Sequence, residues 1–282
     1  MRGVLLCVLA LNSLVFASYL TPNAVDATKA ASHLTQLGAS AKPKLPPGSV
    51  TLGMPLASGA FGKVRWGRIG EKTKCVCKSA TSSQPHADEY LEMEASMNAI
   101  LSKAAPFSRH LAPWVGVCEV GGQKQLVWEA CPGAQYPLSW YFDQPQPQLR
   151  ELALDLGVIQ REAGSGGKCK CLRATEEAAL ARKLLREMLQ ALVLFERAGV
   201  VHRDIKPANW LVDAHTHSLR LVDFGAACEA RLIGGPEVRA VGSEIYMPPE
   251  RTPSMDAPYA FDVYSAAIVW LGTLVPALTS KR

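Results

Sequence analysis

The sequence has little cysteine, few aromatic residues and no strong excess of charge. Its 282 residues include 8 cysteines and 7% aromatic residues, and 30 Lys and Arg stand against 25 Asp and Glu. Such sparse cysteine excludes a disulfide scaffold, and the mild charge excludes the basic surface of a nucleic-acid-binding protein. With 48% apolar and 20% charged residues, the chain is also neither disordered, collagenous nor a coiled coil. It can bury the core of one large domain or two modest ones.

No confident membrane span is present, but the N-terminus carries a shorter apolar stretch. Arg2 precedes the run Val4–Leu11, which has the length of a signal-peptide core, and Val15 and Ala17 suit a cleavage after Ala17. We expect a signal peptide over residues 1–17, with an uncleaved anchor as the alternative.

Residues 18–49 are rich in Ala, Ser, Thr and Lys and contain a single acid, Asp26. This composition cannot build a core and is typical of a transit peptide, although a flexible linker fits it equally well. A signal followed by such a stretch favours bipartite targeting to a plastid, and secretion or an endomembrane lumen is the alternative. Membrane association is expected only through this N-terminal region.

The first part of the remaining chain is rich in predicted strands. Residues 51–78 predict a glycine-bearing hairpin and a further strand, residues 87–103 a helix, and residues 113–130 two strands joined by Gly121 and Gly122.

The second part is rich in predicted helix. A stripe of apolar residues predicts a long helix from Thr175, its expected cap, to Gly199, where it ends. Short strands at 200–201, 210–212 and 219–222 follow, and then a helix over 261–273 that is apolar nearly all round and should be buried. The two parts predict an α+β fold with two lobes and a site between them.

Two motifs in the strand-rich part suit phosphate binding. The segment Leu56–Val64 contains glycines that would let backbone N–H groups approach phosphate oxygens, although ordinary hairpin turns use glycine too. Lys78 could reach phosphates from a strand, and if buried it needs an acid to share its charge. Glu94 is the best partner, with Glu92 and Glu89 as alternatives, while a solvated surface lysine remains the plain reading.

Two further motifs lie in the helix-rich part. The string His202–Asn209 contains Asp204, Lys206 and Asn209, and Asp223-Phe224-Gly225 follows it. An Asp, a Lys, an Asn and a further Asp in this order are typical of a phosphoryl-transfer site.

On these four motifs the chain resembles the eukaryotic protein kinases over residues 52–274, and Lys206 resembles their serine/threonine branch. The resemblance implies a bilobal kinase domain over 50–282, with a lobe of about 50–130 and a helical lobe of about 131–282. It implies transfer of the ATP γ-phosphoryl group to a hydroxyl of a protein substrate, with ATP and Mg²⁺ as cofactors.

The resemblance also implies roles for individual residues. Asp204 would orient the substrate hydroxyl and accept its proton, Lys206 would steady the transferred phosphoryl group, and Lys78 paired with Glu94 would hold the α- and β-phosphates. Asn209 and Asp223 would hold Mg²⁺. The residues that would contact the nucleotide are Ala57, Gly59, Gly62, Val64, Val76, Lys78, Glu129, Cys131 and Leu211.

Around the adenine, the resemblance implies that Val64, Val76 and Leu211 sandwich the ring and that backbone groups of Glu129 and Cys131 meet its edge. Trp128 would close the pocket behind the adenine, or would serve only as a core tryptophan.

A narrower likeness is to the thylakoid state-transition kinases of chloroplasts. It rests on the segments Glu94–Asn98 and Leu126–Trp128 and on the long insert before the helix at 175–198. Those enzymes carry a membrane anchor and lumenal cysteines, and no matching cysteine pair is found in this sequence.

Several residues depart from the family pattern. Ala57 replaces the first glycine of the loop, and Ser243 replaces the Thr whose hydroxyl contacts the catalytic Asp. Asn98 takes a position that is usually apolar, so it needs a partner or costs about 1–3 kcal/mol. Residues 226–241 contain no Ser, Thr or Tyr, so Arg203 lacks a phosphate there, and Glu229 or Glu237 could serve as a fixed charge.

The sequence stops at Arg282, where the helical lobe of the family continues, and Glu250 would there be buried without its arginine partner. We expect a truncated sequence, with a partner that completes the lobe or marginal stability as alternatives. The rival functional readings are a non-catalytic kinase-like binding module and an inactive fragment.

Overall fold

The computed structural model describes residues 43–59, 62–81, 87–132, 135–143, 148–160, 171–234 and 242–275. The expected signal peptide and most of the 18–49 segment lie outside the described residues, as do residues 60–61 of the glycine loop and Glu237. Among the helices that the structure describes, none is long and apolar enough to cross a membrane.

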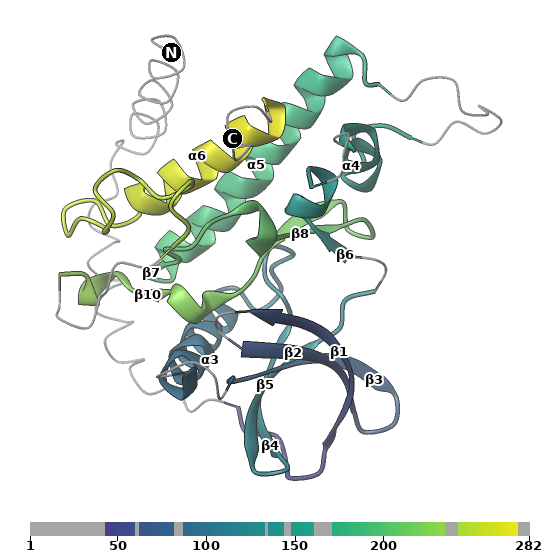
Figure 1. The fold of residues 1–282 in the computed structure, drawn as a ribbon, viewed down its shortest axis with the longest axis vertical. Helices are drawn as coiled ribbons and strands as arrows, with labels where there is room; N and C mark the ends of the chain where they lie inside the picture. The colour runs from purple at the N-terminus through teal and green to yellow at the C-terminus, as the bar shows by residue number, and fades with distance from the viewer. Residues whose placement is uncertain are drawn as a thin grey trace. The chain divides into compact units, whose positions relative to one another are not determined.

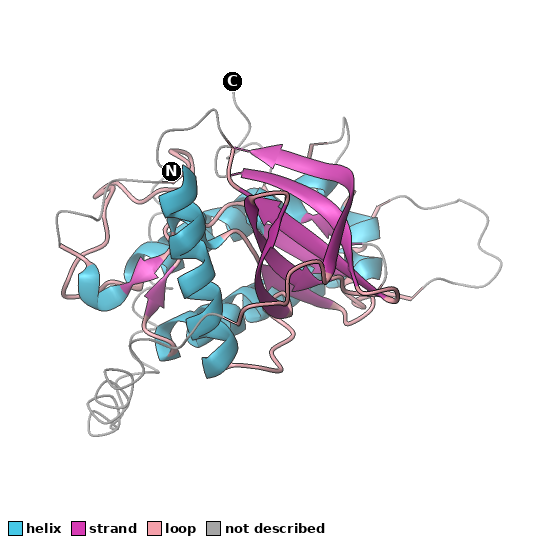
Figure 2. Ribbon diagram, turned by 90° about the horizontal axis from the view of Figure 1, so that it is seen from below, coloured by secondary structure: helices cyan, strands magenta, loops and turns pink. Residues whose placement is uncertain are grey.

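The first lobe is built on a five-stranded antiparallel sheet, as the strand patterns predict (Figures 1 and 2). Its strands, in the spatial order β1-β2-β3-β5-β4, are β1 (Val50–Gly59), β2 (Gly62–Ile69), β3 (Thr73–Ser79), β4 (Trp114–Val120) and β5 (Gln123–Glu129). The register places Val64 opposite Lys78 and Val76 opposite Trp128. Residues that the sequence analysis assigns to the nucleotide therefore lie on adjacent strands.

Small thiols fill the core on one face of this sheet. Cys75 and Cys77 are fully buried on β3 with their Sγ atoms 3.7 Å apart, and Cys118 on β4 joins the same cluster. A Cβ at Gly67 would lie 2.9 Å from the Sγ of Cys75, so the close approach of β2 requires glycine. Burial raises the pKa of all three thiols, which fits their role as neutral core fillers.

Helix α3 (Ala87–Ala104) packs on the sheet through Leu91 and Ala95, which contact Leu126 of β5. These contacts place the buried Glu94 beside strand β3.

The second lobe joins long helices to short strands. Its α-helices and strands are β6 (Gln135–Pro137), α4 (Leu149–Asp155), α5 (Ala174–Arg197), β7 (Val200–Val201), β8 (Trp210–Asp213), β9 (Ser218–Leu221), β10 (Cys228–Glu229) and α6 (Ala260–Leu274). Single 3-10 turns are η1 (Leu138–Tyr141), η2 (Pro207–Asn209), η3 (Phe224–Ala226) and η4 (Ala230–Leu232). The strands pair as β6-β8-β9 and β10-β7.

Two details differ from the expectations for these helices. Helix α5 begins one residue earlier than expected, and Arg173 rather than Thr175 precedes it, because Glu176 accepts a hydrogen bond from the backbone N–H of Arg173 at 2.8 Å. Helix α6 is buried on one face only, through residues such as Phe261 and Val269, while its other face is half-buried.

An ion pair and a hydrogen bond help to hold the second lobe to the loop before β4. Glu187 of α5 is fully buried. Its Oε1 lies 3.0 Å from Nη2 of Arg109 in that loop and 3.0 Å from Nζ of Lys183 in the same helix. Arg220 of β9 pairs with Asp213 at 2.7 Å and also donates to the backbone of that loop. No local sequence pattern predicts the contacts to this loop, because they join residues far apart in the chain.

Candidate active site

Lys78 links two carboxylates from distant parts of the chain. Its Nζ lies 2.7 Å from Oε2 of Glu94 and 2.6 Å from Oδ1 of Asp223. The partner expected first is thus the one observed, and Glu92 instead pairs with Lys124 at the surface. The side chains of Lys78 and Glu94 are only 8% and 2% exposed, which excludes the plain reading of a solvated lysine.

The two carboxylates do not share the lysine charge equally. Burial raises the pKa of Glu94, and Lys78 offsets this only in part, while Asp223 adds a second negative charge nearby. Burial would also raise the pKa of Asp223, but Lys78 outweighs it and brings that pKa below its usual value. Burial acts to lower the pKa of Lys78, and the two carboxylates together raise it. Asp223 and Lys78 are therefore charged at neutral pH.

The backbone at Asp223 has left-handed angles, with φ 66° and ψ 78°, which a non-glycine residue rarely adopts. The next ring, that of Phe224, is buried and packs edge-on against Phe195 and His202, with ring centroids 5.5 and 5.7 Å away. This packing anchors the turn and keeps the Asp223 carboxylate on Lys78.

Asp204 is the centre of a second polar group. Its Oδ2 accepts from Nζ of Lys206 at 2.6 Å and from Nδ2 of Asn209 at 3.3 Å, and its Oδ1 accepts from the hydroxyl of Ser243 at 3.2 Å. The contact expected for Ser243 is thus present. Lys206 also helps to lower the pKa of Asp223, so the two polar groups lie within electrostatic reach of each other.

The loop that carries Asp204 is held from below by helix α6. Both oxygens of Asp262 accept backbone bonds, from the N–H of His202 at 2.7 Å and of Arg203 at 2.9 Å. Arg203 has φ 67°, and its Nε donates to the carbonyl of Ala226 at 2.6 Å. Glu229 pairs with Arg231 at 2.8 Å, and Glu237, the other residue expected to serve as a fixed charge, lies outside the described residues.

The glycine loop brings β1 and β2 close to β3. Ala57 of β1 lies opposite Val64 of β2, and at the ends of these two strands Gly59 lies opposite Gly62. A Cβ at Gly62 would clash with the carbonyl oxygen of Ser79, so this position requires glycine.

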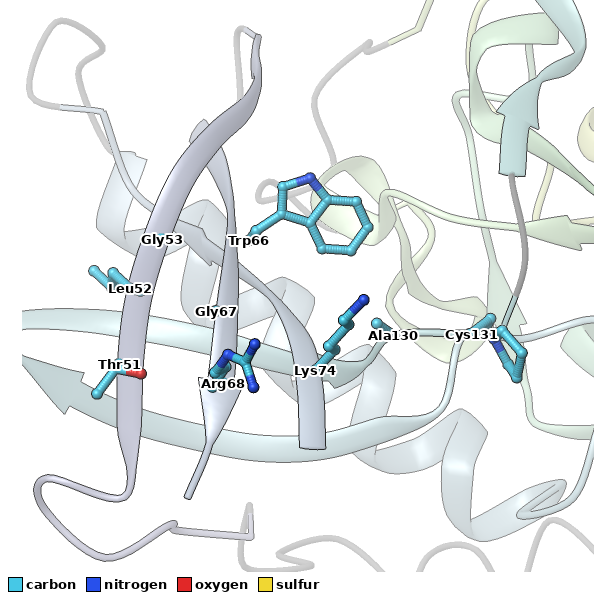
Figure 3. A pocket seen from close by; sticks show the side chains of 10 residues that line it. Thr51, Leu52, Gly53, Trp66, Gly67, Arg68, Lys74, Ala130 and Cys131 are labelled. Atoms are coloured by element: carbon cyan, nitrogen blue, oxygen red, sulfur yellow. The ribbon is translucent and has the colours of Figure 1, made fainter. Parts of the chain in front are cut away.

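The segment after β5 borders a cavity of about 630 Å³. Ala130 and Cys131 line it together with Trp66 and Lys74, whose side chains are shown in Figure 3. None of the residues of the polar groups around Asp204 and Lys78 is among those that line this cavity. It opens beside the strand that the sequence analysis assigns to the adenine edge.

Trp128 and Asn98 meet in a way that the sequence analysis did not anticipate. Nε1 of Trp128 donates to Oδ1 of Asn98 at 2.9 Å, so the buried amide has the partner that it needs.

Glu250 is expected from the sequence to be a buried carboxylate without a partner. Its side chain is instead exposed, so it does not carry the cost of an unpaired buried charge.

Comparison with known proteins gives consistent matches. The model of the protein kinase domain family matches residues 51–279. The chain is 28% identical over 238 residues to the chloroplastic serine/threonine-protein kinase STN8 of Arabidopsis thaliana, covering 74% of this chain and 46% of that protein. It is 30% identical over 207 residues to the serine/threonine-protein kinase pim-2 of Danio rerio, covering 71% and 58%.

A solved structure of a Stt7 homolog from Micromonas algae, soaked with ATP, superposes with a TM-score of 0.61 at 24% identity, covering 81% of this chain and 71% of that one. The chain spans about half the length of the curated relatives STN8 and pim-2. The matched family model extends over most of the sequence and includes both polar groups of the site. The chain belongs to the protein kinase family.

Proposed function

We propose that this chain is a serine/threonine protein kinase that transfers the γ-phosphoryl group of ATP to a protein hydroxyl. The observation that carries the proposal is the bridge from Lys78 to both Glu94 and Asp223, with Asp204 in the neighbouring polar group. A lysine buried between two acids from separate lobes costs solvation free energy, and clusters of strongly perturbed charged groups are typical of functional sites.

Asp204 is the proposed base. It takes the proton of the substrate hydroxyl while the new bond from that oxygen to the γ-phosphorus forms and the bond to the β-phosphate oxygen breaks, which releases ADP. The 2.6 Å bond from Nζ of Lys206 orients the Asp204 carboxylate, and the ammonium group of Lys206 would face the transferred phosphoryl group.

Mg²⁺ fits the residues proposed to hold it. Both bonds from Asn209 to Asp204 use its Nδ2, so its Oδ1 is the atom that can face a cation, and the carboxylate of Asp223 is ionised. Such oxygen atoms are the ligands that Mg²⁺ prefers, and the bound ion would neutralise charge on the phosphates.

The nucleotide base is proposed to lie against the segment after β5. The N–H of Glu129 donates to Pro113 and that of Ala130 to Lys74, at 2.9 and 3.0 Å. Among the described residues, Cys131 N–H has no backbone acceptor, so it is available to the adenine edge. Val64, Val76 and Leu211 would enclose the ring, and each is half-buried.

A transfer assay on the full chain tests this proposal. With radiolabelled ATP, Mg²⁺ and a generic protein acceptor, we expect phosphoserine or phosphothreonine to form, and EDTA present from the start should prevent its formation. A second candidate, a non-catalytic binding module, is favoured by Ala57 in the glycine loop. A Mg²⁺-dependent thermal shift with ATP but no transfer would support that candidate instead.

We also propose a plastid as the site of action. The likeness to STN8, which is named as chloroplastic, and the composition of residues 1–49 support it. A fusion of residues 1–49 to a fluorescent protein should reach the plastid in algal cells, and retention in the endomembrane system would contradict the proposal.

A further inference from the structure

A buried amide joins strand β5 to helix α3 behind the ion pair. Asn98 is 2% exposed, and its Oδ1 accepts the bond from the indole of Trp128 at 2.9 Å. Its Nδ2 donates to the backbone carbonyl of Glu94, one turn earlier on the same helix, at 2.8 Å. One side chain thus connects β5 to the turn of α3 that carries the partner of Lys78.

Each member of the pair would be costly without the other. Asn98 is buried and Trp128 is half-buried, so an amide oxygen or an indole N–H that loses its partner at this contact regains little of its bonding to water. The amide of Asn98 can satisfy its donor within its own helix, but its oxygen depends on Trp128. A change at either position alone therefore leaves one unpaired polar atom, whereas a change at both positions leaves none.

The indole itself is held in place by its neighbours. Trp114 packs edge-on against Trp128 with ring centroids 5.3 Å apart and planes inclined by 61°. Val76 lies opposite Trp128 in the sheet register. Because the ring is confined in this way, helix α3 can move away from the sheet only by breaking the bond to Asn98.

We propose that Trp128 and Asn98 are positioning residues whose hydrogen bond holds helix α3 where Glu94 reaches Lys78. With the bond intact, Lys78 is shared between Glu94 and Asp223. When this bond is broken, helix α3 shifts and Lys78 keeps only Asp223 as its partner. The fraction of molecules in the state that binds ATP, the competent state, then falls. This inference rests on the proposed function and adds to it a residue pair that sets the affinity for ATP.

The size of the effect follows from the fraction of competent molecules. A ligand that binds only the competent state has an apparent dissociation constant raised by the inverse of that fraction. The cost of an unpaired buried group corresponds to a change on the order of tenfold. At saturating ATP the competent state is restored, so kcat changes little while KM for ATP rises.

The test is a double-mutant cycle with Trp128→Phe, Asn98→Leu and the combined variant. We expect each single change to raise KM for ATP about tenfold with kcat nearly unchanged. The combined variant should show a rise well below the product of the two, because two apolar side chains then face each other. Should Asn98→Leu not fold, Asn98→Ala removes the same oxygen without added bulk.

Trp114→Phe is the matched control. Trp114 belongs to the same ring contact, but within the described part of the chain its Nε1 has no hydrogen-bond partner. Phe keeps an aromatic ring against Trp128, so the loss of this N–H should leave KM for ATP within about twofold of wild type.

A readout independent of activity separates this inference from the proposed function. In the spectrum of ¹⁵N-labelled indole groups, Trp128→Phe removes one resonance, which identifies it. Asn98→Leu should shift that resonance and speed its exchange with solvent. Unchanged KM in both single variants, or effects that multiply independently, would overturn the inference. If the wild type transfers no phosphate, the proposed function fails, and the ATP dissociation constants and indole resonance still decide on the pair.

Discussion

The ammonium group of Lys78 lies 2.6 Å from the carboxylate of Asp223, although 145 residues separate them in the chain. The contact crosses from the five-stranded sheet to the turn after β9, so it joins the two lobes through charged atoms. It also brings together the proposed phosphate-binding residue and a proposed metal ligand.

Lys78→Met should destabilise the protein and abolish ATP binding. Removing the cation leaves Glu94, which is almost fully buried, and the partly buried Asp223 without a partner. Breaking a buried pair in this way costs about 3–5 kcal/mol. Because Asp223 is partly exposed, we expect the free energy of unfolding to fall by about 3 kcal/mol. Urea unfolding measures it.

Lys74→Met is the control for this change. Lys74 lies on the same strand but is exposed, so the expected change is within about 0.5 kcal/mol. Equal destabilisation by the two substitutions would show that the buried pairing has no special weight.

Asp204→Asn should reduce kcat by about 10²–10⁴-fold, since a general base contributes about that much. ATP affinity should change little, because Asp204 bonds to Lys206, Asn209 and Ser243 rather than to the ion pair. Steady-state kinetics and ATP titration measure the two quantities. Asp256→Asn, at an exposed position, should leave both unchanged, and wild-type turnover by Asp204→Asn would disprove the assignment of the base.

Ser243→Ala should lower kcat/KM for a protein substrate by roughly tenfold, because Asp204 then loses a hydrogen bond that orients its carboxylate. Ser243→Thr keeps the hydroxyl and should retain wild-type kinetics. If the two variants behave alike, the hydroxyl has no such role.

His110 should make stability depend on pH. Burial lowers its pKa, and the positive charges of Arg109 and Arg220 act in the same direction, while Glu187 and the carbonyl of Leu219 oppose them. The folded state therefore binds fewer protons than the unfolded state at a pH just below the ordinary value of about 6.5. The free energy of unfolding should fall as the pH is lowered through about 6.5 towards the folded pKa.

Urea titrations at several pH values between 7 and 5 measure this slope. His110→Gln should flatten it, whereas His215→Gln, at an exposed turn, should not. A wild-type slope that survives His110→Gln would assign the effect to other groups.

The sequence predicts the sheet well, and the side chains that it assigns to phosphoryl transfer lie in the two polar groups, while their catalytic roles stay predictions. Alternation and glycine turns define β1 to β5, and the order of Lys78, Asp204, Asn209 and Asp223 indicates phosphoryl transfer before any geometry is known. The choice of Glu94 over Glu92 also succeeds, because Glu94 faces the sheet and Glu92 meets the exposed Lys124.

Other features depend on tertiary contacts that a local pattern does not contain. Helix α4 is too short, at 7 residues, to show a helical period, and β6 exists only through its pairing with β8. The bond between Trp128 and Asn98 joins positions on a strand and a helix, so only their packing reveals it.

Asp262 is synthesised about sixty residues after His202 and Arg203, whose backbone N–H groups donate hydrogen bonds to its carboxylate. While the ribosome is still extending the chain, the segment at His202 and Arg203 has already emerged but lacks the acceptor that sets its shape. Transfer chemistry should therefore arise late in translation, when helix α6 docks, and a stalled nascent chain that ends before it should be catalytically silent.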